Sequence, residues 1–105
     1  MATQLKHYST IGTNNKEAAE NFYDELLGLI NAKKFPANDR ITMWRSSEDS
    51  SIILAIAVPY NGEKATFGNG SMKGIALETK EAVDEMYAKA ISLGAKAVSY
   101  THLTL

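Results

Sequence analysis

Apolar residues recur every three or four positions in two stretches of the chain, which predicts two amphipathic helices. The first helix is expected to be capped by Thr13 or Asn14 and to end at Gly28. The second is expected to be capped by Thr79 and to end at Gly94. The two apolar stripes consist of Ala18, Ala19, Phe22, Tyr23, Leu26, Leu27 and Ile30, and of Val83, Met86, Tyr87, Ala90, Ile91 and Leu93.

The beginnings of these two helices repeat one another. Lys16–Tyr23 returns 64 residues later as Lys80–Tyr87, and each position is identical or exchangeable for helix packing. A repeated helix predicts that the chain contains two copies of one structural module.

Alternating and continuous apolar runs predict strands around the helices. Short polar junctions at 38–39 and 46–50 imply antiparallel neighbours, so the first module is expected to be β-α-β-β-β. The second has room only for β-α-β, and residues 63–70 are the candidate linker. The expected strands are Leu5–Gly12, Ala32–Pro36, Arg40–Arg45, Ser51–Val58, Ser71–Leu77 and Ala95 to about Tyr100.

Composition narrows the class of protein. A chain of 105 residues predicts one domain, and 45% hydrophobic with 22% charged residues is typical of a folded soluble protein. Net charge −1 without a basic stripe predicts neither a nucleic-acid nor a membrane partner. The absence of cysteine excludes disulfides, thiolate ligands and a cysteine nucleophile, and fits a cytoplasmic location. The longest apolar run, Ile52–Val58, is too short to span a membrane, which takes about 20 residues.

Three stretches of the sequence resemble the vicinal oxygen chelate superfamily, which includes glyoxalases, bleomycin-resistance proteins and dioxygenases. His7–Asn14 with the helix up to Gly28 resembles the family's opening strand and helix. Pro59–Met72 resembles the segment between modules in one bacterial branch, and Lys80–Gly94 resembles the second helix. The resemblance implies an α+β fold of paired βαβββ modules whose curved sheets form a cup. Module one would span about 5–60, and an incomplete module two about 70–97.

The resemblance places His7 at the first metal-ligand position of the family, where an imidazole would suit a divalent metal. The alternative is a strand histidine that lines the cup or is half exposed. The equivalent position in the second module is Met72 or Gly74, neither of which binds a hard cation, and Ile52–Val58 contains no acid. A metal site is therefore not supported, and a divalent metal is expected only in an intact relative.

Small-molecule binding in the cup is the remaining expectation. For Thr42 and Trp44, packing beneath a helix is as good an interpretation as lining a cup. The candidate cup residues are His7, Ser9, Thr42, Trp44 and Met72.

The last eight residues, 98–105, resemble the translation of a sequencing-library adaptor, read as GTC TCT TAT ACA CAT CTG ACG CTG. The alternative is a genuine β-rich tail. We expect a non-native tail on a C-terminally truncated chain, so His102 is kept out of functional reasoning.

Three functions stay open at this stage. The first is a metal-free protein that binds a small organic molecule in a sheet-lined cup. The second is a metal-dependent lyase or dioxygenase whose ligands lay in missing C-terminal strands, an activity implied by resemblance alone. The third is an inactive truncated fragment. A homodimer is expected because an incomplete cup exposes a sheet edge, and because dimers are common in the superfamily.

Overall fold

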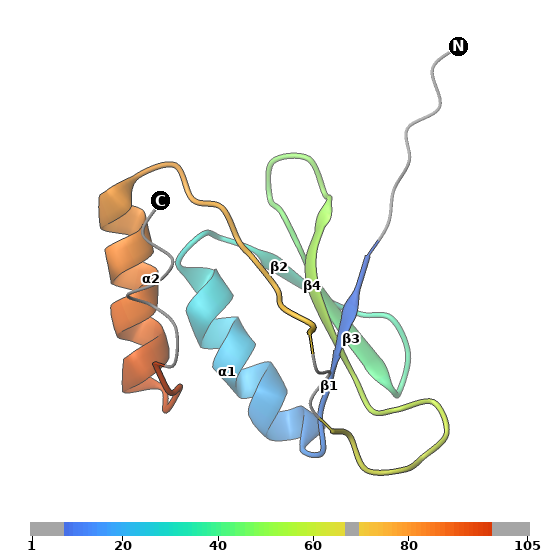
Figure 1. Cartoon of the computed structure of the whole chain (residues 1–105). Helices are drawn as coiled ribbons and strands as arrows, with labels where there is room; N and C mark the ends of the chain where they lie inside the picture. The colour runs from blue at the N-terminus through green and yellow to red at the C-terminus, as the bar shows by residue number, and fades with distance from the viewer. Residues whose placement is uncertain (1–7, 67–69, 98–105) are drawn as a thin grey trace. The chain divides into compact units, whose positions relative to one another are not determined.

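The structure, a computed structural model, describes residues 8–66 and 70–97 (Figure 1). The fold is α+β, as the sequence predicted. The chain divides into a first compact unit that ends at Ile75 and a second that begins at Ala76. The elements in order are β1 (Thr10–Gly12), α1 (Lys16–Gly28), β2 (Lys33–Pro36), β3 (Ile41–Arg45), β4 (Ile52–Ala57) and α2 (Lys80–Ser92).

The first unit contains a mixed sheet of four strands in the order β1-β4-β3-β2. β1 runs parallel to β4, whereas β3 is antiparallel to both β2 and β4. The parallel pair is possible because α1 lies in the connection that leaves β1. The predicted β-α-β-β-β order of the first module is confirmed.

Polar side chains close the two hairpins. Asn38 Oδ1 accepts hydrogen bonds from the backbone N–H of Arg40 at 2.8 Å and of Ile41 at 2.9 Å, which fixes the β2–β3 turn. In the β3–β4 turn, Ser46 N–H donates to Ser51 O at 2.8 Å, and Ser50 adopts a left-handed φ of 61°. These turns are the polar junctions expected from the sequence.

The two central strands, β3 and β4, are buried on both faces. Successive side chains of a strand point to opposite faces, and α1 covers one of these faces (Figure 1). The α1 face holds Thr42, Trp44, Leu54 and Ile56, against the buried Leu26 and Leu27 of α1. The opposite face holds a cluster of Ile41, Met43, Ala55 and Ala57, with Ile52 packed against it.

The start of α1 differs by one residue from the prediction. Its cap is Asn15, whose Oδ1 accepts from Ala18 N–H at 3.0 Å. Neither Thr13 nor Asn14 caps the helix: Thr13 Oγ1 accepts from Asn15 N–H, and the Asn14 amide is engaged elsewhere, as described below. The helix ends at Gly28, as predicted, but Gly28 does not adopt the left-handed conformation that was expected to end it. Leu29 is the C-cap, and the left-handed residue that follows is Asn31, with φ 57°.

The second unit contains α2, which begins and ends as predicted. Thr79 caps it and accepts from Ala82 N–H at 3.0 Å, and Gly94 follows it with a left-handed φ of 105°. α2 has no buried residue. No helix among the described residues has both the length and the apolar content needed to span a membrane.

The internal repeat is reproduced in the geometry of the two helices. Each has 13 residues, and each cap accepts from the third residue after it. Each first turn also carries an ion pair four residues apart, Lys16–Glu20 at 3.1 Å and Lys80–Asp84 at 3.0 Å. Every one of these features recurs at the same spacing as the sequence repeat.

The strands predicted at Ser71–Leu77 and from Ala95 are wrong where the structure describes them. Residues 71–77 and 95–97 belong to no strand. A strand requires a hydrogen-bonded neighbour, and no described strand pairs with either stretch. Residues 98–105, the expected non-native tail, lie outside the described part of the chain.

Candidate functional site

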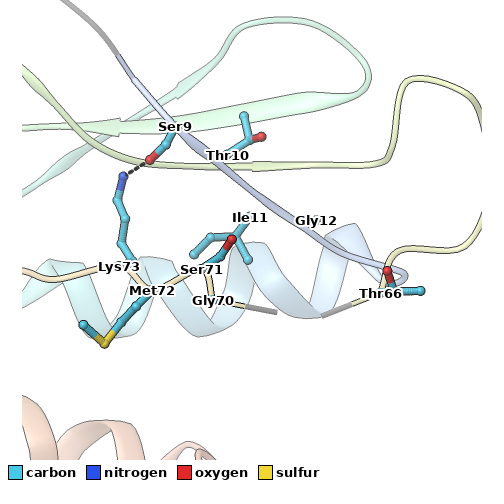
Figure 2. Close-up of a pocket in the computed structure, with 9 residues that line it drawn as sticks. All are labelled: Ser9, Thr10, Ile11, Gly12, Thr66, Gly70, Ser71, Met72 and Lys73. Atoms are coloured by element: carbon cyan, nitrogen blue, oxygen red, sulfur yellow. Dashed lines mark hydrogen bonds between the residues drawn. The ribbon is translucent and has the colours of Figure 1, made fainter. Parts of the chain in front are cut away.

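An open pocket with a volume of about 770 Å³ lies beside β1 in the first unit (Figure 2). One wall is the edge of β1, and the other is the segment 70–73, which follows the loop after β4. The residues that line it are Ser9, Thr10, Ile11, Gly12, Thr66, Gly70, Ser71, Met72 and Lys73.

A hydrogen bond joins the two walls of the pocket. Lys73 Nζ donates to Ser9 Oγ, and Figure 2 shows the lysine side chain reaching from the segment 70–73 toward β1. Gly70 begins this segment with φ 89°, a conformation that favours glycine because it has no Cβ.

The end of the pocket near Thr66 is fixed by a clamp between Asn14 and Ala65. Asn14 Nδ2 donates to Ala65 O at 3.0 Å, and Ala65 N–H donates to Asn14 Oδ1 at 2.7 Å. One amide side chain thereby satisfies both backbone groups of Ala65. The approach is close enough that a Cβ on Gly12 would lie 3.1 Å from Ala65 Cβ. The loop after β4 is therefore held against the β1–α1 turn.

The pocket combines hydroxyl groups, one ammonium group and limited apolar surface. Ile11 supplies an apolar side chain to the wall. Met72 is 80% exposed, and its side chain points away from β1 in Figure 2. The lining residues that the structure describes include no carboxylate, imidazole or thiolate, and a lysine ammonium has no lone pair for a metal.

These lining residues do not fit the divalent metal that the family resemblance implies. More widely, residues 8–66 and 70–97 contain no group of three or more metal-ligating side chains. His7, the position that resembles a family ligand, lies outside these residues.

The predicted cup residues fall in two places. Ser9 and Met72 line the pocket, whereas Thr42 and Trp44 lie beneath α1, at 0% and 1% exposed. Trp44 Nε1 donates to Asp24 Oδ1 at 3.0 Å, and its ring lies 5.6 Å from that of Tyr23. The packing of an aromatic residue beneath a helix was the alternative interpretation of Trp44.

The polar contacts beneath α1 involve the carboxylates of the helix. Thr42 Oγ1 donates to Glu20 Oε1 at 2.5 Å. This hydrogen bond, assisted by Lys16 and opposed by partial burial, holds the pKa of Glu20 below its ordinary value. Burial raises the pKa of Tyr23. These contacts join α1 to β3, so Thr42 and Trp44 position the helix.

Sequence reasoning missed Lys73 and Asn14. The signal for Lys73 was present, because it follows Ser9 by the repeat spacing of 64 residues. A residue and its repeat equivalent can meet when two modules pack side by side. No comparable signal pointed to Asn14, whose partner Ala65 is 51 residues away in a loop.

Comparison with solved structures gives a close match. The chain is similar to the crystal structure of a glyoxalase/bleomycin resistance protein from Albidiferax ferrireducens T118, with a TM-score of 0.72 and 34% sequence identity. The match covers 83% of this chain and 68% of that one. No family model and no curated protein matches the sequence.

Proposed function

Because the chain belongs to the glyoxalase/bleomycin resistance protein family, we propose that it binds a small organic molecule in the pocket beside β1. The observation that carries this proposal is the pocket itself, which contains the predicted residues Ser9 and Met72. Its volume of about 770 Å³ falls within the range of small-molecule sites, roughly 300–1,000 Å³.

The lining suits a ligand of mixed polarity. Hydroxyl groups on both walls can each donate and accept hydrogen bonds, and Ile11 offers an apolar contact. The Asn14–Ala65 clamp holds the loop after β4 against the β1–α1 turn, and the Lys73–Ser9 hydrogen bond joins the segment 70–73 to the wall formed by β1. Pre-formed walls reduce the entropy lost on binding.

Fragment screening by two-dimensional amide NMR tests the proposal. A mixed set of neutral, anionic and cationic fragments should shift the amides of residues 9–12 and 70–73. The amide signals of β2, at the far edge of the sheet, should not shift. A Ser71→Trp variant, which fills the pocket, should abolish these shifts. Ser47→Trp, on the exposed β3–β4 turn, is the matched control and should retain them.

Two outcomes would contradict the proposal. If no fragment of any charge shifts these amides, the third possibility, an inactive fragment, is favoured. If one equivalent of a divalent ion binds tightly in a calorimetric titration, the metal-dependent alternative returns, with His7 as the first ligand to replace. We expect no stoichiometric metal binding, because the described lining presents an ammonium group.

We further propose that the protein is a homodimer. Large apolar side chains are exposed on the first unit, with Tyr60 at 88% and Phe35 at 41%, and a second copy that covered them would remove apolar surface from water. The edge of β2 is a poor candidate for the contact, because Lys33, Lys34 and Pro36 discourage strand pairing. Sedimentation equilibrium should give twice the mass of one chain, and the mass of a single chain would contradict this proposal.

A further inference from the structure

The nine lining residues that the structure describes carry charge of one sign. Lys73 is the only charged side chain among them, and Ser9, Thr10, Thr66 and Ser71 supply neutral hydroxyl groups. A pocket with this lining attracts anions and repels cations.

Lys73 has no counter-ion within the described residues. The ion pairs there join Lys16 to Glu20, Lys34 to Asp24 and Lys80 to Asp84. The ammonium group of Lys73 instead donates to the hydroxyl of Ser9. A lysine ammonium has three donors, and this hydrogen bond uses one of them.

Lys73 carries these remaining donors on the pocket lining. Its side chain crosses from the segment 70–73 to β1, and its contact with Ser9 is exposed to solvent (Figure 2). An anion that reaches the ammonium group replaces part of its hydration with a charge-assisted hydrogen bond. The hydroxyl of Ser9 is held beside the ammonium and can donate its own proton to the same anion.

We infer that the ligand is a small organic anion, whose charged group contacts Lys73 and Ser9 while its apolar part contacts Ile11. This inference rests on the proposed function, since it names the ligand class of the same pocket.

Benzoate and its neutral counterpart benzamide test the inference in amide NMR titrations. Benzoate should bind more tightly, with shifts at Ser9, Ile11 and Lys73. Lys73→Met should weaken benzoate binding by about ten-fold or more, since hydrogen bonds to charged groups are stronger than those between neutral groups. Benzamide should be little affected, and Lys73→Arg should restore most of the benzoate affinity.

The control variant is Lys33→Met, which removes an exposed lysine from β2 at the opposite edge of the sheet. It should leave benzoate binding unchanged. Salt should weaken benzoate more than benzamide, because it screens charge.

The possible results distinguish the inference about the ligand class from the proposal that the pocket binds a ligand. If benzamide binds as tightly as benzoate and Lys73→Met changes neither, the proposed function stands and the anion inference is overturned. If Lys33→Met weakens benzoate binding as much as Lys73→Met does, the effect reflects the overall charge of the protein, and the proposed contact with Lys73 is contradicted. If neither probe shifts the amides, both this inference and binding in this pocket are contradicted.

Discussion

Ser9 and Lys73 are joined by a hydrogen bond and are 64 residues apart, the spacing of the internal repeat. This spacing relates them as matching positions of the repeat seen in the sequence. The segment 70–73 lies beside β1 but belongs to no strand. The pocket lies between them, so two residues related by the repeat spacing meet at the candidate site.

The hydrogen bond from Trp44 to Asp24 is expected to contribute to stability. Asp24→Ala would leave the buried Trp44 Nε1–H without an acceptor, which costs about 1–3 kcal/mol. Asp24→Asn keeps an acceptor oxygen and should cost less. Urea unfolding measures both variants, and equal losses for Ala and Asn would show that the exposed Lys34–Asp24 ion pair matters more than the buried hydrogen bond.

Thr42→Val should reduce stability in a pH-dependent way. The hydrogen bond from Thr42 holds the pKa of Glu20 below its ordinary 4.5. A lowered pKa in the folded state means that this stabilisation is present above the unfolded pKa and is lost as pH falls through the folded pKa. The free energy of unfolding of the variant should be lower by about 1–3 kcal/mol at pH 7. The difference between the variant and the protein with Thr42 should be smaller at acidic pH.

A carboxyl NMR titration provides the second readout for this variant. The pKa of Glu20 should rise in Thr42→Val and stay unchanged in Thr10→Val, which alters an exposed threonine of β1. A constant pKa for Glu20 in both variants would contradict the role given to Thr42.

Gly12→Ala is expected to destabilise the first unit by about 1–3 kcal/mol, because the new methyl group would crowd Ala65. Ala65 cannot retreat while Asn14 holds its backbone by two hydrogen bonds. In an Asn14→Ala background the same change should therefore cost less. Gly28→Ala is the control: Gly28 has open space around it, is the last residue of α1 and has no left-handed φ, so this change should be neutral or should stabilise by up to about 0.5–1 kcal/mol. Additive losses in the double mutant would argue against the clamp.

Removing the cap of α1 and removing the cap of α2 should affect the protein differently. Asn15→Ala and Thr79→Ala each remove a cap that contributes about 1 kcal/mol. α1 supplies the buried Leu26 and Leu27, so loss of its cap should lower the free energy of unfolding of the first unit. α2 has no buried residue, so loss of its cap should appear as faster amide exchange within α2. Equal shifts in the unfolding midpoint would contradict this difference.

Local pattern was sufficient for most of the fold. The stripe from Ala18 to Ile30 predicted α1, and the short polar junctions predicted the hairpins of β2, β3 and β4. Errors occurred where a distant residue competes for a local role. Asn14 fits a cap by sequence but bonds to Ala65, and Ser71–Leu77 fits a strand but has no paired neighbour. Patterns of neighbouring residues cannot predict such contacts, because they depend on residues that are distant in the sequence.

The sequence by itself determined the helices and the family resemblance, because helical periodicity acts over a few residues and the motifs of a family are read directly from the chain. Only the tertiary structure decided which side chains share a site. Alternation along β3 places Thr42 and Trp44 on one face, but whether that face meets a helix or a ligand depends on where α1 packs. It meets α1, and the candidate site lies instead at the β1 edge, where Lys73 meets Ser9.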